Sequence, residues 1–511
     1  MPSDTPEQQP PHPDEDLDVL AADDAAEEIE EVDNDNDMAM DSGDEDEELT
    51  LVNDAIAYFD EPQDSLFTIA QHPVHPSLVA LGGSAGAHDD APGAGWVVDT
   101  SAAQSRPVLP ASFASDPSAA AAADRPPPTA LASLYALEGH TDSINSLCWT
   151  LPAGEVLVSG GLDGRLRAWS ADAKPSSGLT MTPLGETQEV EEVNWLAACP
   201  SPAHPNTVAL GANDGSVWVY TIDPSDASNA LQIVQSYFLH TAACTAGTWT
   251  PDGRLLATVS EDGTLYVWDV WGEAAARGSV DSNGQTAVAM SPEDQRFEVE
   301  GGLYSVAIDP KATFVAVGGS GGAIKIVSLP RLGGAPTTQQ GKKSGGGGGG
   351  ADATTGGQIL ASLHTQSDGV ETLAVTLAQT TPATVLLAAG SVDGSICVYD
   401  ATRRFAVRRH IIGAHEEHSV VKVEFVKNSW TLTSCGMDGV VRRWDLRGSA
   451  VGAGAQATGG AAAPHDGGLI KEWKGHRGDG EGGGVLGFVQ GETGERVVTA
   501  GDDGVSLVFE A

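Results

Sequence analysis

Short runs of alternating apolar and polar residues follow one another along most of the chain. In the segment 159–170 two such runs flank the pair Asp163–Gly164, and Trp169 stands six residues after the Asp. Alternation with a period of two is typical of half-buried β-strands, and Asp-Gly is a strong signal for a tight hairpin turn. The segment therefore predicts two antiparallel strands joined by this turn.

The same unit recurs with fixed spacing. Five more Asp-Gly pairs are each followed, six residues after the Asp, by an aromatic residue; the Asp residues are Asp214, Asp262, Asp393, Asp438 and Asp503, and the aromatic residues are Tyr220, Trp268, Tyr399, Trp444 and Phe509. A His stands 22 to 29 residues before the Asp in five units, at His140, His240, His364, His415 and His476. Several units also place a Ser or Thr four residues before the Asp. Such a period indicates a repeat architecture.

This arrangement resembles the WD-repeat family, in which His, Ser or Thr, Asp and Trp form a hydrogen-bonded network inside each four-stranded blade of a β-propeller. The resemblance implies two complete structural networks: His140, Ser159, Asp163 and Trp169, and His415, Ser434, Asp438 and Trp444. The segments 64–98 and 301–330 keep the strand alternation with a degenerate motif, which brings the count to eight. We therefore expect an all-β fold, an eight-bladed WD-repeat β-propeller with a disordered acidic N-terminal tail.

The chain ends inside the third strand of its last unit, in "VSLVFEA". The last blade then lacks an outer strand unless another segment supplies it. Residues 50–59, "TLVNDAIAYF", are the candidate, because pairing them with the C-terminal blade would close the ring and remove exposed sheet edges.

Charge divides the chain into segments. Residues 1–50 contain 21 Asp or Glu and no Lys or Arg, and the whole chain of 511 residues carries a formal charge of −46. Such a segment buries too little apolar area to offset its chain entropy. We expect a disordered acidic tail over 1–48 and the propeller over 49–511, with flexible insertions near 102–130, 333–357 and 449–468.

The body is acidic even without the tail, which indicates the kind of partner. Direct binding of nucleic acid is not expected, because it requires Lys and Arg to neutralise phosphates. A basic protein is the expected partner. No apolar run reaches the length of a membrane span, and the N-terminus lacks the basic residues of a signal peptide. We expect a monomer that resides in the cytoplasm, with the nucleus as a second compartment.

Catalytic and metal-binding motifs are weak. Residues 318–322 match Gly-x-Ser-x-Gly, but they fill an expected strand-to-strand turn, whereas a nucleophile elbow needs a strand-to-helix turn. The five cysteines, Cys148, Cys199, Cys244, Cys397 and Cys435, are scattered through apolar runs and are interpreted as reduced core residues. No enzymatic activity, cofactor or metal is expected.

Four segments carry a more specific resemblance: "VEEVNW" (190–195), "NDGSVWVY" (213–220), "VDGSICVYDATRRFAVRRH" (392–410) and "TAGDDGVSLVFE" (499–510). They resemble the fungal WD-repeat ribosome-assembly chaperones dedicated to a basic large-subunit ribosomal protein of the L-ten (uL sixteen) type, whose animal relative is the angio-associated migratory cell protein. The resemblance covers roughly residues 45–511. It implies that the propeller binds a basic N-terminal segment of the unassembled ribosomal protein and delivers it to the pre-60S ribosome.

The expected binding surface is the top face, which is formed by the loops that enter each innermost strand and by the turns between second and third strands. Glu191 and Glu371 are expected at equivalent positions there. The full set of candidate partner-binding residues is Asp142, Glu191, Glu192, Glu261, Glu371 and Asp502, with Tyr304 as an apolar anchor. An acidic ring of this kind would attract a peptide rich in Lys and Arg.

Two other functions compete with this one. A general WD-repeat scaffold that joins proteins without any part in ribosome assembly would need the same propeller, but could use the blade sides and loops of mixed charge. A phosphopeptide reader would need an Arg cluster on the top face. The available arginines, Arg403, Arg404, Arg408 and Arg409, instead flank an expected outer strand.

Overall fold

The computed structural model describes residues 53–86, 88, 91–105, 127–174, 178–226, 228–332, 356–447, 467–478 and 483–511. Within these ranges the chain forms strands and three 3-10 helices, η1 (Thr100–Ala102), η3 (Ala275–Arg277) and η4 (Ala401–Arg403), and no α-helix. The acidic segment expected over 1–48 and most of the three expected insertions lie outside the described residues.

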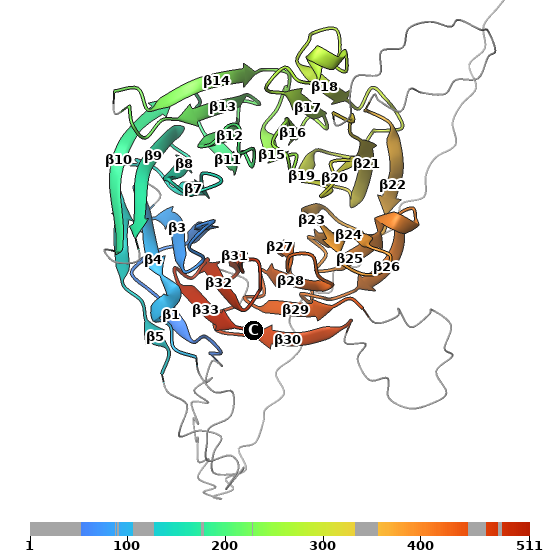
Figure 1. The fold of residues 1–511 in the computed structure, drawn as a ribbon. Coiled ribbons are helices and arrows are strands. Elements are labelled where there is room, and N and C mark those ends of the chain that lie inside the picture. The colour runs from blue at the N-terminus through green and yellow to red at the C-terminus, as the bar shows by residue number, and fades with distance from the viewer. Residues whose placement is uncertain are drawn as a thin grey trace, which may run out of the picture. The chain divides into compact units, whose positions relative to one another are not determined.

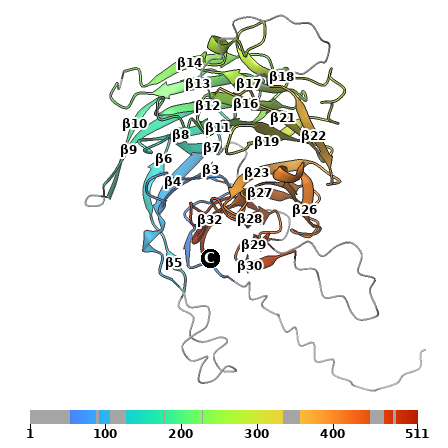
Figure 2. The ribbon, with the colours of Figure 1, turned by 45° about the vertical axis from the view of Figure 1, so that its right-hand side comes forward.

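The strands of residues 51–511 form eight sheets arranged as the blades of a ring (Figure 1). The innermost strands contact one another in chain order, and the last one contacts the first, so the ring is closed. Figure 2 shows the blades from a second direction. The expected eight-bladed all-β propeller is confirmed, including the two blades with degenerate motifs.

The first four blades, each from its innermost to its outermost strand, have the following bounds. Blade 1 contains β2 (Leu66–Gln71), β3 (Leu78–Ser84), β4 (Gly93–Asp99) and β6 (Ser133–Leu137). Blade 2 contains β7 (Ile144–Trp149), β8 (Val156–Gly161), β9 (Arg165–Lys174) and β10 (Gly178–Gln188). Blade 3 contains β11 (Val193–Ala198), β12 (Thr207–Ala212), β13 (Val217–Ile222) and β14 (Leu231–Tyr237). Blade 4 contains β15 (Cys244–Trp249), β16 (Leu255–Ser260), β17 (Leu265–Asp269) and β18 (Thr286–Met290).

The remaining blades continue in the same order. Blade 5 contains β19 (Leu303–Ile308), β20 (Phe314–Gly319), β21 (Ala323–Ser328) and β22 (Ile359–His364). Blade 6 contains β23 (Val370–Ala378), β24 (Thr384–Ser391), β25 (Ile396–Asp400) and β26 (Ala406–Ile411). Blade 7 contains β27 (Val420–Phe425), β28 (Thr431–Gly436), β29 (Val441–Asp445) and β30 (Leu469–Trp473). Blade 8 contains β31 (Val485–Val489), β32 (Arg496–Gly501) and β33 (Ser506–Glu510), and then β1 (Ala57–Phe59) and β5 (Thr129–Ala130).

Blade 8 joins the two ends of the propeller sequence. Strand β1 pairs antiparallel with β33, with Tyr58 opposite Leu507, so the closure expected from residues 50–59 is confirmed for Ala57–Phe59. Strand β5, at the end of the first expected insertion, adds a parallel fifth strand outside β1. The N-terminal strand thereby covers what would otherwise be an open sheet edge.

The core lies between neighbouring blades. The second strand of a blade, such as β8 or β16, is buried along its whole length because its sheet is covered on both faces. Trp195 of blade 3 packs in one cluster with Leu256 and Trp268 of blade 4. A Cβ built on Gly247 would lie 2.1 Å from the Trp195 ring, so a side chain there would collide with the indole.

The Asp-Gly turns have a backbone reason. The Gly of each pair, for example Gly164 with φ 72° and Gly439 with φ 72°, adopts the left-handed conformation that other residues rarely reach. In the degenerate blade 5, Gly322 has φ 76° at the same point of the turn. The turn is therefore retained where its Asp is lost.

Candidate functional site

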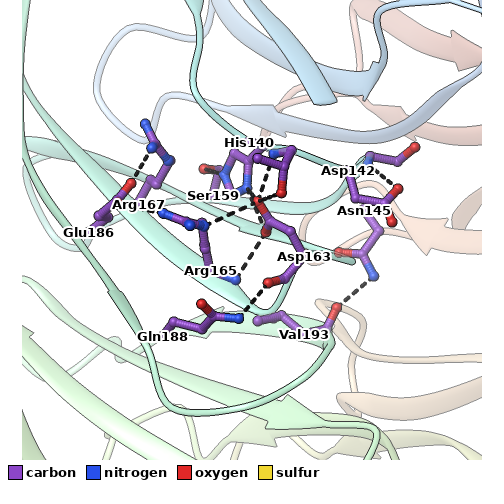
Figure 3. A network of polar contacts seen from close by, with 12 residues as sticks. His140, Asp142, Asn145, Ser159, Asp163, Arg165, Arg167, Glu186, Gln188 and Val193 are labelled. Carbon is purple, nitrogen blue, oxygen red and sulfur yellow. Dashed lines mark hydrogen bonds and ion pairs between the residues drawn. The ribbon is translucent and has the colours of Figure 1, made fainter. Parts of the chain in front are cut away.

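The repeat histidine of blade 2 links two strands and a turn (Figure 3). His140 Nδ1 lies 3.0 Å from Asp163 Oδ1, and His140 Nε2 lies 2.7 Å from Ser159 Oγ. Because the carboxylate can only accept, the imidazole proton is on Nδ1 and Ser159 donates to Nε2. Trp169, 3% exposed, packs in the apolar cluster that contains Leu157. The expected network of His, Ser and Asp is confirmed in this blade.

Asp163 is held as a carboxylate. Burial opposes its ionisation, but hydrogen bonds from His140 and from the backbone N–H groups of Thr141 and Arg165 outweigh this effect and lower its pKa to about 2. Its oxygens are therefore occupied inside the blade. Asp163 is a structural residue, as expected, and is not free to bind a partner.

Blade 7 contains the complete network. His415 Nδ1 lies 2.9 Å from Asp438 Oδ1, His415 Nε2 lies 2.8 Å from Ser434 Oγ, and Trp444 Nε1 donates to Ser434 Oγ at 2.9 Å. The guanidinium of Arg442 also donates to Asp438. Burial opposes the ionisation of Asp438, but His415 and Arg442 outweigh it and lower the pKa to about 2.

One assignment of the repeat histidines is wrong. In blade 6 the spacing pointed to His364, but this residue is the exposed last residue of β22. Gln366 occupies the network position: its Nε2 donates to the carbonyl oxygens of Ala389 and Ser395, and the next residue, Ser367, donates its N–H to Asp393. The Gln366 amide takes the place of the imidazole. The nearest His in the sequence, His364, lies two residues before this position.

The turns and the entry loops meet at one edge of the propeller, the top face. The turn between the second and third strands of a blade has one position that is Asp in six of the blades. In all eight blades the residue just before this position donates its N–H to the carbonyl oxygen of the residue that precedes the innermost strand. These bonds are Ser84 to Ser65, Leu162 to Ser143, Asn213 to Glu192, Glu261 to Ala243, Ser320 to Gly302, Val392 to Gly369, Met437 to Ser419 and Asp502 to Gly484. A residue of the turn and a residue of the entry loop therefore lie side by side on the top face.

Each innermost strand begins with a β-bulge at its second residue. That residue has no partner in the ladder to the second strand. The bulge residues, in blade order 1 to 8, are Phe67, Asn145, Asn194, Thr245, Tyr304, Glu371, Val421 and Leu486. Bulges commonly redirect side chains at functional edges of sheets. Here they form a ring of eight side chains on the top face.

Three consecutive members of this bulge ring bond to the next blade. Asn145 donates to the carbonyl of Val193 at 2.6 Å (Figure 3), Asn194 to that of Cys244 at 3.1 Å and Thr245 to that of Leu303 at 2.6 Å. Each acceptor is the first residue of the next innermost strand. These contacts place the side chains along the ring, from blade 2 to blade 5.

Glu191 and Glu371 do not occupy equivalent positions, contrary to the expectation. Glu371 is the bulge residue of β23, whereas Glu191 lies two residues before β11. The expectation counted back from Trp195 and Val375, but Trp195 is the third residue of β11 and Val375 is the sixth residue of β23. The position that corresponds to Glu191 is acidic in four blades: Asp64, Asp142, Glu191 and Asp368. Asp64 and Asp368 were missed, although their place two residues before an apolar strand was a signal.

The other candidates divide between the loops and the turns. Glu192 lies directly after Glu191 in the entry loop of blade 3, and Asp142 accepts the N–H of Ser143 in that of blade 2 at 2.7 Å. Glu261 precedes the turn Asp of blade 4 and is exposed. All of them belong to the top face.

Tyr304, Glu261 and Glu371 form a group on neighbouring blades 4, 5 and 6. Tyr304 is 38% exposed. Partial burial raises the pKa of its phenol, and the charges of Glu261 and Glu371 add to the shift, so both carboxylates lie within electrostatic range of the ring. Although the Glu371 residue is exposed, desolvation of its carboxyl group by the surrounding protein, together with the charge of Asp368, raises its pKa. This clustering of like charge favours a cationic ligand.

Asp502 already has a partner. Ser65 Oγ donates to Asp502 Oδ1 at 2.6 Å, and the same hydroxyl lies 3.0 Å from the Asp502 carbonyl oxygen. Since Ser65 precedes β2 and Asp502 follows β32, this contact joins blade 8 to blade 1. Asp502 therefore contributes to ring closure as well as to the charge of the top face.

The weak motifs have structural roles. Ser320, the serine of the Gly-x-Ser-x-Gly match, lies in the hairpin turn between β20 and β21 and donates to the Glu300 carbonyl at 2.7 Å. All five cysteines are free, and burial raises the pKa of each thiol. The described part of the chain contains no cluster of His, Cys, Asp or Glu suited to a metal ion. Its helices include none that could cross a membrane.

Comparisons with known proteins place this fold in a family. The model of the WD domain, G-beta repeat, matches residues 131–170 and 231–269. The crystal structure of Chaetomium thermophilum Sqt1 bound to the N-terminus of the ribosomal protein L10 is 53% identical, covers 90% of this chain and 100% of that one, and superposes with a TM-score of 0.74. The chain belongs to the Sqt1 family.

More distant relatives agree with this assignment. The ribosome assembly protein SQT1 of Saccharomyces cerevisiae is 26% identical over 498 residues, which are 94% of this chain and 92% of the yeast protein. An uncharacterized WD repeat-containing protein of Schizosaccharomyces pombe is 29% identical, but the match spans only 55% of that protein's length. The human angio-associated migratory cell protein is 22% identical over 74% of this chain and 69% of its own length. The resemblance to WD-repeat ribosome-assembly proteins is confirmed.

Proposed function

We propose that this protein is a dedicated chaperone of the large-subunit ribosomal protein L10, of the uL sixteen type. It binds the basic N-terminal segment of that protein on the top face and delivers it to the pre-60S ribosome. The observation that carries the proposal is the match over the full length of a 53%-identical Sqt1 that was crystallised with the N-terminus of L10.

The charge of the top face supports this function. Its carboxylates include exposed Glu191, Glu261 and Glu371, and the chain as a whole has a formal charge of −46. A concentration of one charge raises the association rate of a ligand of opposite charge. Single exposed ion pairs contribute only about 0.2–1 kcal/mol, so capture needs several of them together with an apolar anchor such as Tyr304.

The other candidate functions have less support. A general scaffold unrelated to ribosomes would account for the propeller, but not for the full-length match to Sqt1. We assign no catalytic activity to the chain, since the chaperone role requires none. We place the protein in the cytoplasm, where ribosomal proteins are synthesised, with the nucleus as a second compartment, and we expect it to act as a monomer.

Co-expression tests the chaperone role. L10 expressed alone is expected to precipitate, whereas L10 expressed with this protein should remain soluble and co-purify with it. L10 that lacks its N-terminal segment should not co-purify and serves as the control. Equal solubility of L10 with and without this protein, together with no co-purification, would contradict the proposal.

A further inference from the structure

The bulge ring of the top face has two different parts. In blades 2, 3 and 4 its side chains are polar and bond to the next blade. In blades 5, 6, 7, 8 and 1 the bulge residues are Tyr304, Glu371, Val421, Leu486 and Phe67. Strands β19, β23, β27, β31 and β2 are consecutive neighbours around the ring, so these five residues occupy consecutive bulge positions, which we call the arc.

The side chains of the arc cannot form the hydrogen bonds to the next blade that Asn145, Asn194 and Thr245 form in blades 2, 3 and 4. Phe67, Val421 and Leu486 have no polar atom to donate, and the Glu371 carboxylate only accepts. In blade 5 the carbonyl of Val370, which is the equivalent acceptor, is taken by Ser305 Oγ at 2.7 Å instead of by Tyr304.

Apolar surface remains exposed as a result. Phe67 is 40% exposed and Tyr304 is 38% exposed, and they mark the two ends of the arc. Val421 and Leu486 between them are partly exposed. Exposed apolar surface bordered by polar groups marks interaction sites.

Carboxylates accompany this apolar arc. Glu371 is its second member, and Asp64 and Asp368 stand at the entry loops of blades 1 and 6. Asp64 and Asp368 each accept the N–H of the following residue, at 2.8 and 2.7 Å. A peptide bound along the arc would therefore meet negative charges at blades 6 and 1 and apolar side chains at blades 5, 7, 8 and 1.

We propose that the arc of Tyr304, Glu371, Val421, Leu486 and Phe67 is the anchor site for apolar side chains of the L10 N-terminal segment. Lys and Arg of the peptide face Glu371, Asp368 and Asp64, while its apolar residues cover Phe67 and Leu486. The polar side of the ring, blades 2 to 4, contributes charge but no anchor. This inference rests on the proposed function and assigns the specificity of the same face.

A binding experiment separates the apolar contribution from the electrostatic one. The L10 N-terminal peptide is titrated calorimetrically into the wild type and into the double variant Phe67→Ser, Leu486→Ser at 0.1 M and 0.5 M salt. The double variant should bind about tenfold more weakly at both salt concentrations, because apolar contacts are not screened by ions. The control Ile470→Ser, at a 57% exposed position on the outer strand β30, should bind as the wild type does.

A second peptide makes the test independent of the variant's folding. In it the apolar residues are replaced by Ser while every Lys and Arg is kept. The wild type should bind this peptide about tenfold more weakly, and the double variant should lose little further affinity with it, since the same contacts are already absent. Equal affinity of the wild type for both peptides would overturn the anchor site while leaving the proposed function intact. Failure of the wild type to bind the unmodified peptide would instead contradict the proposed function.

Discussion

At the scale of single residues, the polar groups that hold a blade together are distinct from those exposed on the top face. Asp163 and Asp438 are enclosed by His, backbone N–H groups and, for Asp438, Arg442. Glu191 and Glu371 are exposed at the top face. Substitutions in the first pair should therefore affect stability, and substitutions in the second should affect binding.

The blade 7 network gives a stability prediction. Asp438→Ala removes the carboxylate and leaves buried His415 and Arg442 without this partner, so the free energy of unfolding should fall by about 1–3 kcal/mol. The midpoint of urea unfolding measures the effect. The control is Asp214→Ala, because Asp214 is exposed and its side-chain contacts are with Ser216 in its own turn. Equal midpoints for the two variants would contradict the network's role.

His72 predicts a pH dependence. It is 4% exposed, and its Nδ1 accepts the N–H groups of Val74 and His75, so the folded protein needs the neutral imidazole. Burial and the neighbouring His75 lower the pKa of His72 from 6.5 to about 4. Between pH 6.5 and 4 the unfolded chain therefore binds more protons than the folded one, and stability should fall as the pH falls, by at most about 3 kcal/mol.

The variant His72→Asn isolates this effect. Its amide oxygen can accept the same N–H groups but does not titrate. The difference between urea midpoints at pH 7 and pH 4.5 should be smaller for the variant than for the wild type. The same difference in both proteins would show that His72 does not cause the pH dependence.

At the scale of elements, strand β1 is the closing element of the ring. It pairs with β33 and in turn supports β5. Deletion of residues 1–45 leaves β1 intact and should hardly change the thermal transition. Deletion of residues 1–62 removes β1, exposes the edge of blade 8 and should lower the transition temperature sharply. Equal effects of the two deletions, measured by circular dichroism, would rule out closure by β1.

Much of this element structure could be predicted from the sequence, since alternation and Asp-Gly turns are local signals. The turn Gly is retained even in blade 5, where Gly322 has φ 76°. Strand β5 could not be predicted, because it has two residues and forms only beside β1. Gln366 could not be distinguished from His364 by spacing, because only the contacts of the folded blade show which side chain reaches Ala389.

The candidate site was only partly predictable for a similar reason. Acidic residues in entry loops are visible in the sequence, and Asp142, Glu191 and Glu261 do lie on the top face. The bulge that redirects Glu371 and Tyr304 depends on pairing with the second strand, and pairing registers are not local. The arc of bulge residues in blades 5, 6, 7, 8 and 1 could therefore be recognised only in the folded structure and not in the sequence.

At the scale of the whole molecule, the closed ring gathers carboxylates on its top face, and the ligand proposed for that face is basic. Because much of the attraction acts between charges near solvent, affinity for the L10 N-terminal peptide should fall with added salt, as the Debye length shortens from about 10 Å at 0.1 M to about 3 Å at 1 M. A dissociation constant that stays the same from 0.1 to 0.5 M salt would contradict an electrostatic contribution.

Charge reversal at the top face tests the central claim most directly. Calorimetric titration of the L10 N-terminal peptide into the wild type, Glu371→Lys and Glu492→Lys compares the same change of charge at two places, since Glu371 lies at the start of β23 on the top face and Glu492 follows the end of β31 at the opposite edge. Glu371→Lys should weaken binding about tenfold at 0.1 M salt without unfolding the protein, and Glu492→Lys should bind nearly as the wild type does. If folded Glu371→Lys binds the peptide as tightly as the wild type, the top face is not the binding site for L10.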